Sequence, residues 1–262
     1  MNRLKGRVAL VTGGGRGIGR AIALALAREG AAVAVSSRTL PELEKVAKEV
    51  EACGGAGALA VRADATRRDD QRAAVRRVIA SFGQLDVLVN NAGGVIAPRG
   101  LQDLMPFTHD DALFEENLVL NLTSAYWATA EALPHMRDRG YGRVMTVGSG
   151  YAKRSGGMLA YTAAKHGVVG FTRALAAQVA PFGITVNCLC PGWTNTSLLD
   201  WDVLALAYGT TPAGARAIAE SENLQKRILE PEELGPMAVL LASEEAAGIT
   251  GQVVSVDGGY KV

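Results

Sequence analysis

The sequence has few of the residues that build metal centres or disulfide-stapled folds. Its 262 residues include only three cysteines and three histidines. Cys188 and Cys190 are separated by one residue, and no CxxC motif or Cys/His cluster with metal-ligand spacing occurs. We therefore expect neither a disulfide framework nor a bound metal. Reduced thiols are typical of a cytoplasmic protein, which is the location that we predict.

The sequence also lacks an excess of charge and a long apolar run. Its 27 basic residues almost balance its 26 acidic residues, for a formal net charge of +1. This balance gives no electrostatic footprint for nucleic acid or for an anionic membrane. No apolar stretch approaches the roughly 20 residues that span a bilayer. With 48% hydrophobic and 20% charged residues, the composition excludes a disordered chain and predicts a globular protein.

Short apolar segments alternate with helical patterns along the whole chain. Strands are predicted at residues 7–11, 31–35, 58–62, 85–90, 143–147, 184–190 and 252–256. Helices are predicted between them, at about 18–29, 39–54, 68–82, 110–137, 161–180 and 231–243. Continuously apolar strands are typical of a parallel sheet covered by helices on both faces. The pattern predicts a single α/β domain over residues 1–262, doubly wound and Rossmann-type, with three layers and a seven-stranded parallel sheet.

One segment interrupts this alternation. The stretch 191–230 is much longer than the usual connection of about 2–6 residues. It contains Trp193, Trp201 and Tyr208 among leucine, alanine and glycine. Because long insertions on a rigid scaffold commonly carry function, we expect a substrate lid with one or two short helices. A surface insertion or an oligomer contact is the alternative interpretation.

A glycine cluster stands between the first predicted strand and the first predicted helix. A pyrophosphate can approach the backbone closely where residues lack a Cβ, and a helix N-terminus supplies N–H donors. A strict GxGxxG match fails because Ile18 stands where the third glycine would be, but the position after a strand and before a helix favours dinucleotide binding. The predicted cofactor contacts from this turn are Gly13, Gly15, Arg16, Gly17, Ile18 and Gly19.

The end of the second predicted strand carries no acidic residue. An acid there would accept hydrogen bonds from the adenosine ribose and favour NAD(H). The sequence has Ser36, Ser37 and Arg38 instead. Arg38, together with Arg16, could pair with a 2′-phosphate through charge-assisted hydrogen bonds. This arrangement predicts NADP(H) in preference to NAD(H), and two solvated surface arginines are the alternative.

Tyr161 and Lys165 lie four residues apart on a predicted helix and therefore share one face. A phenol has an ordinary pKa of about 10, and a nearby ammonium group lowers that pKa by favouring the phenolate. Such a phenol suits general acid–base chemistry at a carbonyl. Ser149 follows a predicted strand at the carboxyl edge of the sheet, where folds of this class bind ligands. Its hydroxyl could hold a substrate carbonyl beside Tyr161.

The whole set of motifs resembles the short-chain dehydrogenase/reductase family over residues 5–262. The matching segments are Thr12-Gly13-x3-Gly17-x-Gly19, Asp64, Asn90-Asn91-Ala92-Gly93, Ser149, Tyr161-x3-Lys165, Pro191-Gly192 and Val256-Asp257-Gly258-Gly259. The resemblance implies that Tyr161 is the proton donor and acceptor, that Lys165 holds the nicotinamide ribose and that Ser149 polarises the carbonyl. It also implies a proton relay through Asn121, which precedes Ser149 by 28 residues as in the family, whereas Asn117 precedes it by 32.

The same resemblance implies further cofactor contacts and an assembly. Asp64 and Ala65 would contact the adenine, and Asn91, Ala92 and Gly93 would line the cofactor cleft. The stretch 191–196 would reach the carboxamide through Pro191, Gly192, Thr194 and Thr196, with Thr196 as the hydroxyl partner. A homotetramer, or at least a homodimer, would pack through helices such as those at 110–137 and 161–180.

These observations predict reversible NADP(H)-dependent hydride transfer between a ketone and a secondary alcohol. An apolar small molecule or an acyl-CoA type of compound is the expected substrate. The first alternative is a 3-oxoacyl-[acyl-carrier-protein] reductase. It is disfavoured because Gly140 and Phe182 stand where the family's carrier-dependent members would place cations. The second alternative is a non-catalytic NADP(H)-binding sensor, which the presence of Tyr161 and Lys165 disfavours.

Overall fold

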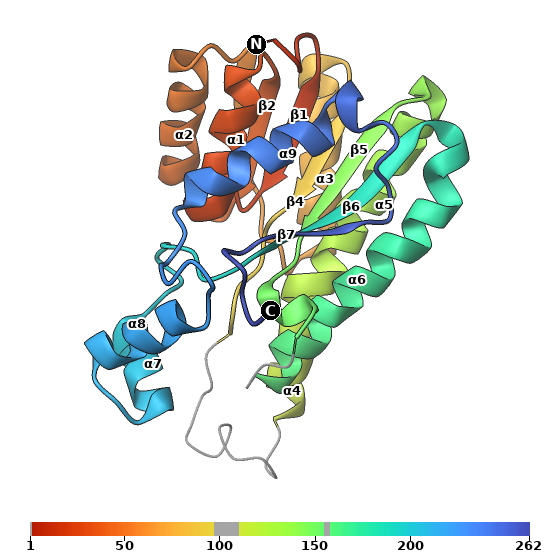
Figure 1. The fold of residues 1–262 in the computed structure, drawn as a ribbon. Helices are drawn as coiled ribbons and strands as arrows, with labels where there is room; N and C mark the ends of the chain where they lie inside the picture. The colour runs from red at the N-terminus through yellow and green to blue at the C-terminus, as the bar shows by residue number, and fades with distance from the viewer. Residues whose placement is uncertain (1, 97–109, 155–157) are drawn as a thin grey trace.

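A seven-stranded parallel sheet forms the centre of the computed structural model, which describes residues 2–96, 110–154 and 158–262 (Figure 1). Its strand order is β3-β2-β1-β4-β5-β6-β7, as the doubly wound prediction requires. The strands are β1 (Val8–Thr12), β2 (Ala32–Ser37), β3 (Gly57–Arg62), β4 (Val87–Asn90), β5 (Gly142–Val147), β6 (Ile184–Pro191) and β7 (Val253–Val256). The predicted fold class is confirmed.

The chain order of the strands reverses beside β1, which pairs with β2 on one side and β4 on the other. Leu10 lies opposite Ala34 in β2 and opposite Leu88 in β4. In sheets of this class the crevice outside the carboxyl ends of such strands is where ligands bind. The register therefore places the segments that follow β1, β2 and β4 around one crevice.

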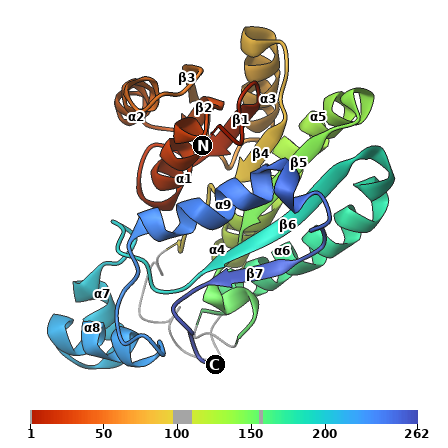
Figure 2. The same cartoon turned by 45° about the horizontal axis from the view of Figure 1, so that its top comes forward.

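Helices cover both faces of the sheet, and Figure 2 shows the two layers on either side of the strands. One layer contains α1 (Gly17–Arg28), α2 (Leu40–Ala52) and α9 (Gly235–Ala242). The other contains α3 (Arg68–Phe82), α5 (Ser124–Arg139) and α6 (Leu159–Val179). Side chains alternate between the faces of a strand, so Ala9 and Val11 join the first core while Val8 and Leu10 join the second.

Two predicted helices are less regular than their sequence patterns indicated. The predicted helix at 110–137 consists of α4 (Asp111–Leu118), a π-helical turn at Val119–Thr123 and α5. The helix predicted at 231–243 begins with a 3₁₀ turn at Pro231–Leu234, where a capping box between Glu230 and Glu233 holds the first turn. Other 3₁₀ turns are Gly150–Ala152, Ala180–Phe182 and Glu244–Ala246.

The segment 191–230 contains two short helices, α7 (Trp201–Tyr208) and α8 (Pro212–Ser221). Asp200 caps α7 by accepting hydrogen bonds from two backbone N–H groups, and Thr211 caps α8. Figure 1 shows both helices side by side, apart from the two layers that cover the sheet. Their arrangement is compatible with a lid, which stays a prediction.

Two absences concern only the part of the chain that the structure describes. There, no helix is both long and apolar enough to cross a membrane. Within the same residues, no group of histidine, cysteine and acidic side chains is arranged to hold a metal ion.

Candidate functional site

The glycine turn after β1 is tied to the segment that follows β4. The Thr12 hydroxyl accepts hydrogen bonds from the backbone N–H groups of Asn91 (3.1 Å) and Ala92 (3.0 Å). In return, the Asn91 amide donates to the carbonyl oxygens of Thr12 (3.0 Å) and Gly13 (3.1 Å). These four hydrogen bonds join two of the predicted cofactor-binding segments into one wall.

The glycines at this wall are required by space and by backbone conformation. Gly13 has φ +64°, and a Cβ there would lie 2.9 Å from the Ala92 Cα and the Asn91 amide nitrogen. A Cβ on Gly19 would collide with the Gly13 carbonyl oxygen and with the Asn91 amide. Side chains are therefore excluded from the positions where the turn passes closest to its neighbours.

The N-terminus of α1 is left open toward this turn. Arg16 occupies the N-cap position, but no side chain caps the helix and its first turn contains no acidic residue. Free N–H groups and the positive end of the helix dipole make such a terminus a binding site for phosphate groups. The turn therefore fits the pyrophosphate of a dinucleotide, as the spacing of Gly13, Gly17 and Gly19 predicts.

The predicted adenosine-binding residues lie together at the ends of β2 and β3. Ser37 ends β2, and its Oγ accepts a hydrogen bond from the Thr39 N–H (3.3 Å). Burial raises the pKa of Asp64. The effect of burial is outweighed by hydrogen bonds from the Thr66 N–H and hydroxyl and by the positive charges of Arg38 and Arg67. The pKa of Asp64 therefore lies below its ordinary value. Ala65 follows Asp64 directly.

Glu42 is an acidic residue near this edge that the sequence analysis did not identify. Glu42 is in the first turn of α2, and its side chain lies beside Gly15. A Cβ built on Gly15 would be 3.3 Å from the Glu42 side chain and 3.3 Å from the Ser37 Oγ. Arg16 and Arg38 are both exposed at the same end of the sheet. Within the described residues neither Arg16 nor Arg38 has an ion pair, and the edge carries two carboxylates, Asp64 after β3 and Glu42 on α2.

Asn121 and Lys165 border Gly93 from two sides. A Cβ on Gly93 would lie 2.8 Å from the Asn121 Oδ1 and 3.3 Å from the Lys165 Nζ. The Asn121 side chain is 2% exposed, accepts a hydrogen bond from the Gly94 N–H (2.9 Å) and donates one to the Gly94 carbonyl (2.9 Å). Its π-helical turn is of the kind that is frequent at functional sites. The side chain of Asn117 donates to the Leu113 carbonyl within its own helix (2.9 Å) and accepts from the Ile96 N–H (3.5 Å).

Lys165 is a buried cation held beside the ring of Tyr161. Its Nζ is 5.6 Å from the Tyr161 ring centre and donates a hydrogen bond to the Val147 carbonyl (2.9 Å) at the end of β5. Only 4% of Lys165 is exposed. A buried ammonium group needs polar partners, and one hydrogen bond leaves two of its three N–H donors for other groups.

Ser149 follows the same strand and begins the 3₁₀ turn Gly150–Ala152. Its Oγ accepts a hydrogen bond from the Tyr151 N–H (3.1 Å). Because that bond occupies a lone pair, the hydroxyl proton is left to donate to another acceptor. The turn thus orients Ser149 as a donor at the carboxyl edge of the sheet.

Tyr151 is a site residue that the sequence analysis missed. Its ring meets the Tyr161 ring edge-on at 6.2 Å between centres and the Tyr260 ring at 6.3 Å. Burial, followed by repulsion from Tyr260, raises the pKa of Tyr151 to about 12, so it stays a neutral phenol. Its position two residues after Ser149 was the available signal, but no motif marks it.

The stretch 191–196 runs past the glycine turn. The Thr196 methyl group would lie 3.2 Å from a Cβ built on Gly17 and is its nearest neighbour. The Thr196 Oγ1 accepts a hydrogen bond from the Leu198 N–H (3.3 Å). Thr194 is buried, and its hydroxyl donates to the Gly192 carbonyl (3.0 Å). Thr196 therefore lies at the crevice, whereas the hydroxyl of Thr194 holds the loop.

Comparison with known proteins agrees with this arrangement. A family model described as short chain dehydrogenase matches residues 7–202. A D-beta-hydroxybutyrate dehydrogenase from Cupriavidus necator is 34% identical, over 98% of each chain. A cis-4-hydroxycyclohexanecarboxylate dehydrogenase from Sinomonas cyclohexanicum is 36% identical, over 97% of this chain and 96% of the relative. The crystal structure of a levodione reductase superposes with a TM-score of 0.90 at 31% identity, over 98% of both chains.

Proposed function

Since the chain belongs to the short-chain dehydrogenase/reductase family, we propose that it transfers a hydride reversibly between NADP(H) and an apolar ketone or secondary alcohol. Members of this family are oxidoreductases that act on alcohol and ketone substrates with NAD(P)(H). The observation that carries the proposal is the grouping of Ser149, Tyr161 and Lys165 beside the wall formed by the glycine turn and Asn91.

The proposed chemistry divides between two hydroxyl groups. The nicotinamide, when bound, supplies or accepts the hydride at the substrate carbon. Ser149 donates its hydroxyl proton in a hydrogen bond to the substrate oxygen, while its Oγ accepts from the Tyr151 N–H. Tyr161 gives its phenolic proton to that oxygen during reduction and takes it back during oxidation.

Lys165 and Asn121 are proposed to help return a proton to Tyr161 after each reduction. The Lys165 ammonium group lies beside the phenol ring and has N–H donors beyond the one used by the Val147 carbonyl. Asn121 is fixed by three hydrogen bonds, and its Oδ1 and the Lys165 Nζ are the nearest neighbours of a Cβ built on Gly93. We propose that a water molecule held between these two side chains returns a proton to Tyr161 after each reduction.

The preference for NADP(H) rests on charge at the adenosine edge. Arg16 and Arg38 supply two cations, and Ser37 ends the strand where an acid would favour NAD(H). Glu42 is the competing feature, because its carboxylate would repel a 2′-phosphate if it turned toward it. Asp64 adds a second carboxylate at this edge, but hydrogen bonds from the Thr66 N–H and hydroxyl hold it, so the two guanidinium groups favour the phosphate.

The segment 191–230 supports an apolar substrate. Leu198 in this segment is 60% exposed. Its side chain is also the nearest neighbour of a Cβ built on Gly94, which follows β4. Two of the relatives named above, a cis-4-hydroxycyclohexanecarboxylate dehydrogenase and a levodione reductase, are named for ring compounds. We propose that this chain also takes a secondary alcohol or ketone on a small, largely apolar molecule.

Purified protein mixed with NADPH and a panel of cyclic, linear and thioester ketones tests the proposal. Loss of nicotinamide absorbance with one class of ketone is the expected result. Tight NADPH binding with no turnover of any ketone would contradict it and favour the sensor alternative. Sedimentation of the same sample tests the predicted homotetramer, which stays a prediction together with the cytoplasmic location.

A further inference from the structure

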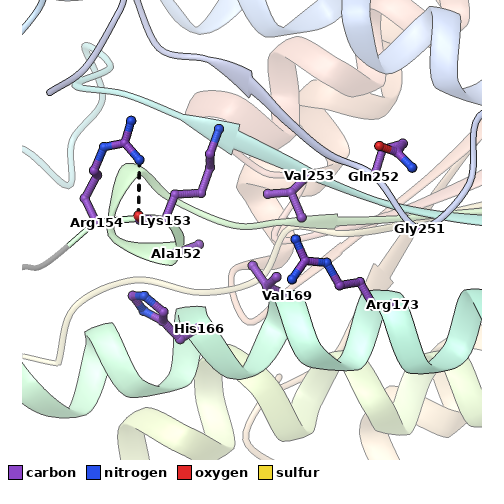
Figure 3. A pocket seen from close by; sticks show the side chains of 9 residues that line it. All are labelled: Ala152, Lys153, Arg154, His166, Val169, Arg173, Gly251, Gln252 and Val253. Carbon is purple, nitrogen blue, oxygen red and sulfur yellow. Dashed lines mark hydrogen bonds between the residues drawn. The ribbon is translucent and has the colours of Figure 1, made fainter. Parts of the chain in front are cut away.

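The turn after β5, the serine turn (residues 149–154), is bonded to the C-terminal end of the chain. Lys153 Nζ donates a hydrogen bond to the Ser255 hydroxyl (2.8 Å) in β7, and Arg154 Nε donates one to the Lys261 carbonyl (2.9 Å). Figure 3 shows the side chains of Lys153 and Arg154 extending from this turn, away from α6. The far end of the serine turn is therefore held by residues about a hundred positions later in the sequence.

The ring of Tyr260 packs against the near end of the serine turn. A Cβ built on Gly150 would lie 2.5 Å from the Tyr260 Cδ1 and 2.6 Å from its Cε1, so the ring occupies the space that a side chain at Gly150 would need. The same ring lies 6.3 Å from the Tyr151 ring, and Tyr151 meets Tyr161 edge-on. Tyr260 therefore supports both of the residues that directly follow Ser149.

The ring of Tyr260, and not its hydroxyl, makes this contact. Tyr260 is only 4% exposed, and its hydroxyl oxygen has no hydrogen-bond partner within the part of the chain that the structure describes. Burial of a hydroxyl without a partner costs free energy, whereas burial of an aromatic ring is favourable. A phenylalanine at this position would therefore keep the contact.

The backbone on both sides of Tyr260 is fixed by the residues that follow α8. The Leu224 N–H donates a hydrogen bond to the Gly259 carbonyl (3.1 Å). The Lys261 N–H donates to the Glu222 carbonyl (2.9 Å), and its Nζ lies 3.1 Å from the Glu222 carboxylate. Because Gly259 and Lys261 flank Tyr260, these bonds hold its ring in place against the serine turn.

We propose that Tyr260 is a positioning residue, whose ring holds the serine turn so that the Ser149 hydroxyl points at the substrate oxygen. The inference rests on the proposed function, in which Ser149 donates a hydrogen bond to that oxygen. The Ser149 Oγ accepts from the Tyr151 N–H, so a shift of Gly150 or Tyr151 displaces the hydroxyl. A displacement of about 1 Å can cost about a hundredfold in rate. Tyr260 is buried within a single chain, so this role needs no exposed face.

Kinetics of variants at this position test the proposal, with NADPH and a ketone that the wild type reduces. Tyr260→Leu removes the ring and should lower kcat by about tenfold, because a small displacement of a reacting group slows a reaction strongly. Tyr260→Phe keeps the ring and should retain kcat within about twofold of the wild type. The dissociation constant of NADPH should stay within about twofold in both variants, since the cofactor wall is not altered.

The decisive measurement combines Tyr260→Leu with Ser149→Ala, at raised protein concentration. If Tyr260 acts through Ser149, then Tyr260→Leu should lower kcat by less than about twofold once the Ser149 hydroxyl is absent, although it lowers the wild-type kcat by about tenfold. A general loss of structure would instead lower kcat by the same factor in both proteins. The double substitution therefore separates positioning of Ser149 from a merely structural role.

Tyr141→Leu is the matched control for the loss of a packed tyrosine ring. Tyr141 precedes β5, at the opposite end of the strand from Ser149, and the Arg7 and Arg143 guanidinium groups lie 3.5 and 4.2 Å from its ring centre. Both Tyr141→Leu and Tyr260→Leu should unfold at a lower temperature than the wild type, because each loses a packed ring. Only Tyr260→Leu should lower kcat.

Gly150→Ala disturbs the same contact from its other side. The new methyl group would overlap with the Tyr260 ring, so this variant should also lower kcat by about tenfold at unchanged affinity for NADPH. It keeps the proposal testable if Tyr260→Leu does not fold.

Four results would overturn the inference and leave the proposed function standing. They are equal kcat values for Tyr260→Phe and Tyr260→Leu, a full tenfold loss from Tyr260→Leu in the Ser149→Ala protein, a wild-type kcat for Gly150→Ala, and a wild-type kcat for Ser149→Ala. In the last case Tyr260 would have no donor to position. Absence of ketone turnover by the wild type would instead overturn the proposed function, and this inference with it.

Discussion

The two sides of the crevice, the cofactor wall (residues 12–19 and 91–93) and the lid segment (residues 191–230), are built in different ways. The wall is held by hydrogen bonds between Thr12, Asn91 and the backbone, and its glycines leave no room for side chains. The lid segment presents apolar side chains to solvent, with Leu206 85% exposed. We propose from this difference that the wall serves chemistry common to the family, whereas the lid segment selects the substrate of this chain.

The largest expected effect is at Tyr161, beside the wall. Tyr161→Phe removes the proton donor and should lower kcat by about a thousandfold, within the range for general acid–base groups. Dinucleotide affinity, measured by fluorescence titration, should stay unchanged, since we assign the hydroxyl to the substrate and not to the dinucleotide. A variant that retains full turnover would remove Tyr161 from its assigned role.

The next effect tests the wall itself. Gly19→Ala places a methyl group against the Gly13 carbonyl and the Asn91 amide, and should cost about 1–3 kcal/mol of stability and weaken dinucleotide binding. Gly248→Ala, at an exposed glycine with nothing within 4 Å of the new Cβ, is the control and should change stability by less than about 0.5 kcal/mol. Thermal unfolding and dinucleotide titration measure both. Equal behaviour of the two variants would show that the wall is not closely packed.

Arg38 tests the cofactor preference at the outer end of the wall. Arg38→Asp should repel a 2′-phosphate and accept ribose hydroxyls, and so shift the NADP-to-NAD ratio of kcat/KM toward NAD by about tenfold or more. Arg28→Asp, at the exposed end of α1, is the control for the change of charge alone. If both variants keep the wild-type ratio, the phosphate interpretation is wrong.

A smaller effect is expected in the lid segment. Leu206→Ser should raise the KM for an apolar ketone a few-fold. The substitution removes exposed leucine surface from the lid segment, which is expected to cover the ketone. Stability should change by less than about 0.5 kcal/mol, as is usual at exposed positions. Phe182→Ser, at an exposed aromatic outside the lid segment, is the control. An unchanged KM would mean that α7 does not contact the substrate.

The smallest effect concerns the junction between the lid segment and the body. Arg227 holds Glu233 through two short hydrogen bonds, which, with the Glu230 N–H, lower the pKa of Glu233 from 4.5 to about 2. A lowered pKa adds stability above pH 4.5 that is lost as the pH falls through about 2. The Glu233 side chain is 35% exposed, so solvent screening reduces the contribution to about 1 kcal/mol.

Glu233→Gln should therefore lower the free energy of unfolding at neutral pH, and the difference from the wild type should shrink below pH 4.5. Denaturant unfolding at several pH values measures it. Glu220→Gln, which removes the exposed pair with Arg216 on α8, is the control and should cost about 0.3–0.5 kcal/mol. A difference that grows toward low pH would contradict the assignment.

The sequence predicted the parts of the molecule in which local pattern and packing agree. Apolar runs such as Val8–Val11 have one stable place in a covered parallel sheet, and the glycine turn has one backbone solution between strand and helix. The resemblance to the family, through its spacing to Ser149, favoured Asn121 over Asn117, and this choice stays a prediction. The structure adds that Asn121 lies in a π-helical turn, which no periodicity revealed.

Features that depend on distant segments could not be predicted. Tyr151 meets Tyr260, more than a hundred residues away, only because β5 and the C-terminal segment meet at the carboxyl edge of the sheet. Glu42 approaches Gly15 because α2 begins beside the glycine turn.

Deuterium transfer tests the central claim most directly. The protein is incubated with NADPH that carries deuterium at the transferable C4 position and with the ketone panel, and the alcohol products are analysed by mass spectrometry. The account predicts deuterium on the carbinol carbon with the wild type, and almost none with Tyr161→Phe although it still binds NADPH. Bound NADPH without deuterium in any product, or equal transfer by both proteins, would contradict the account.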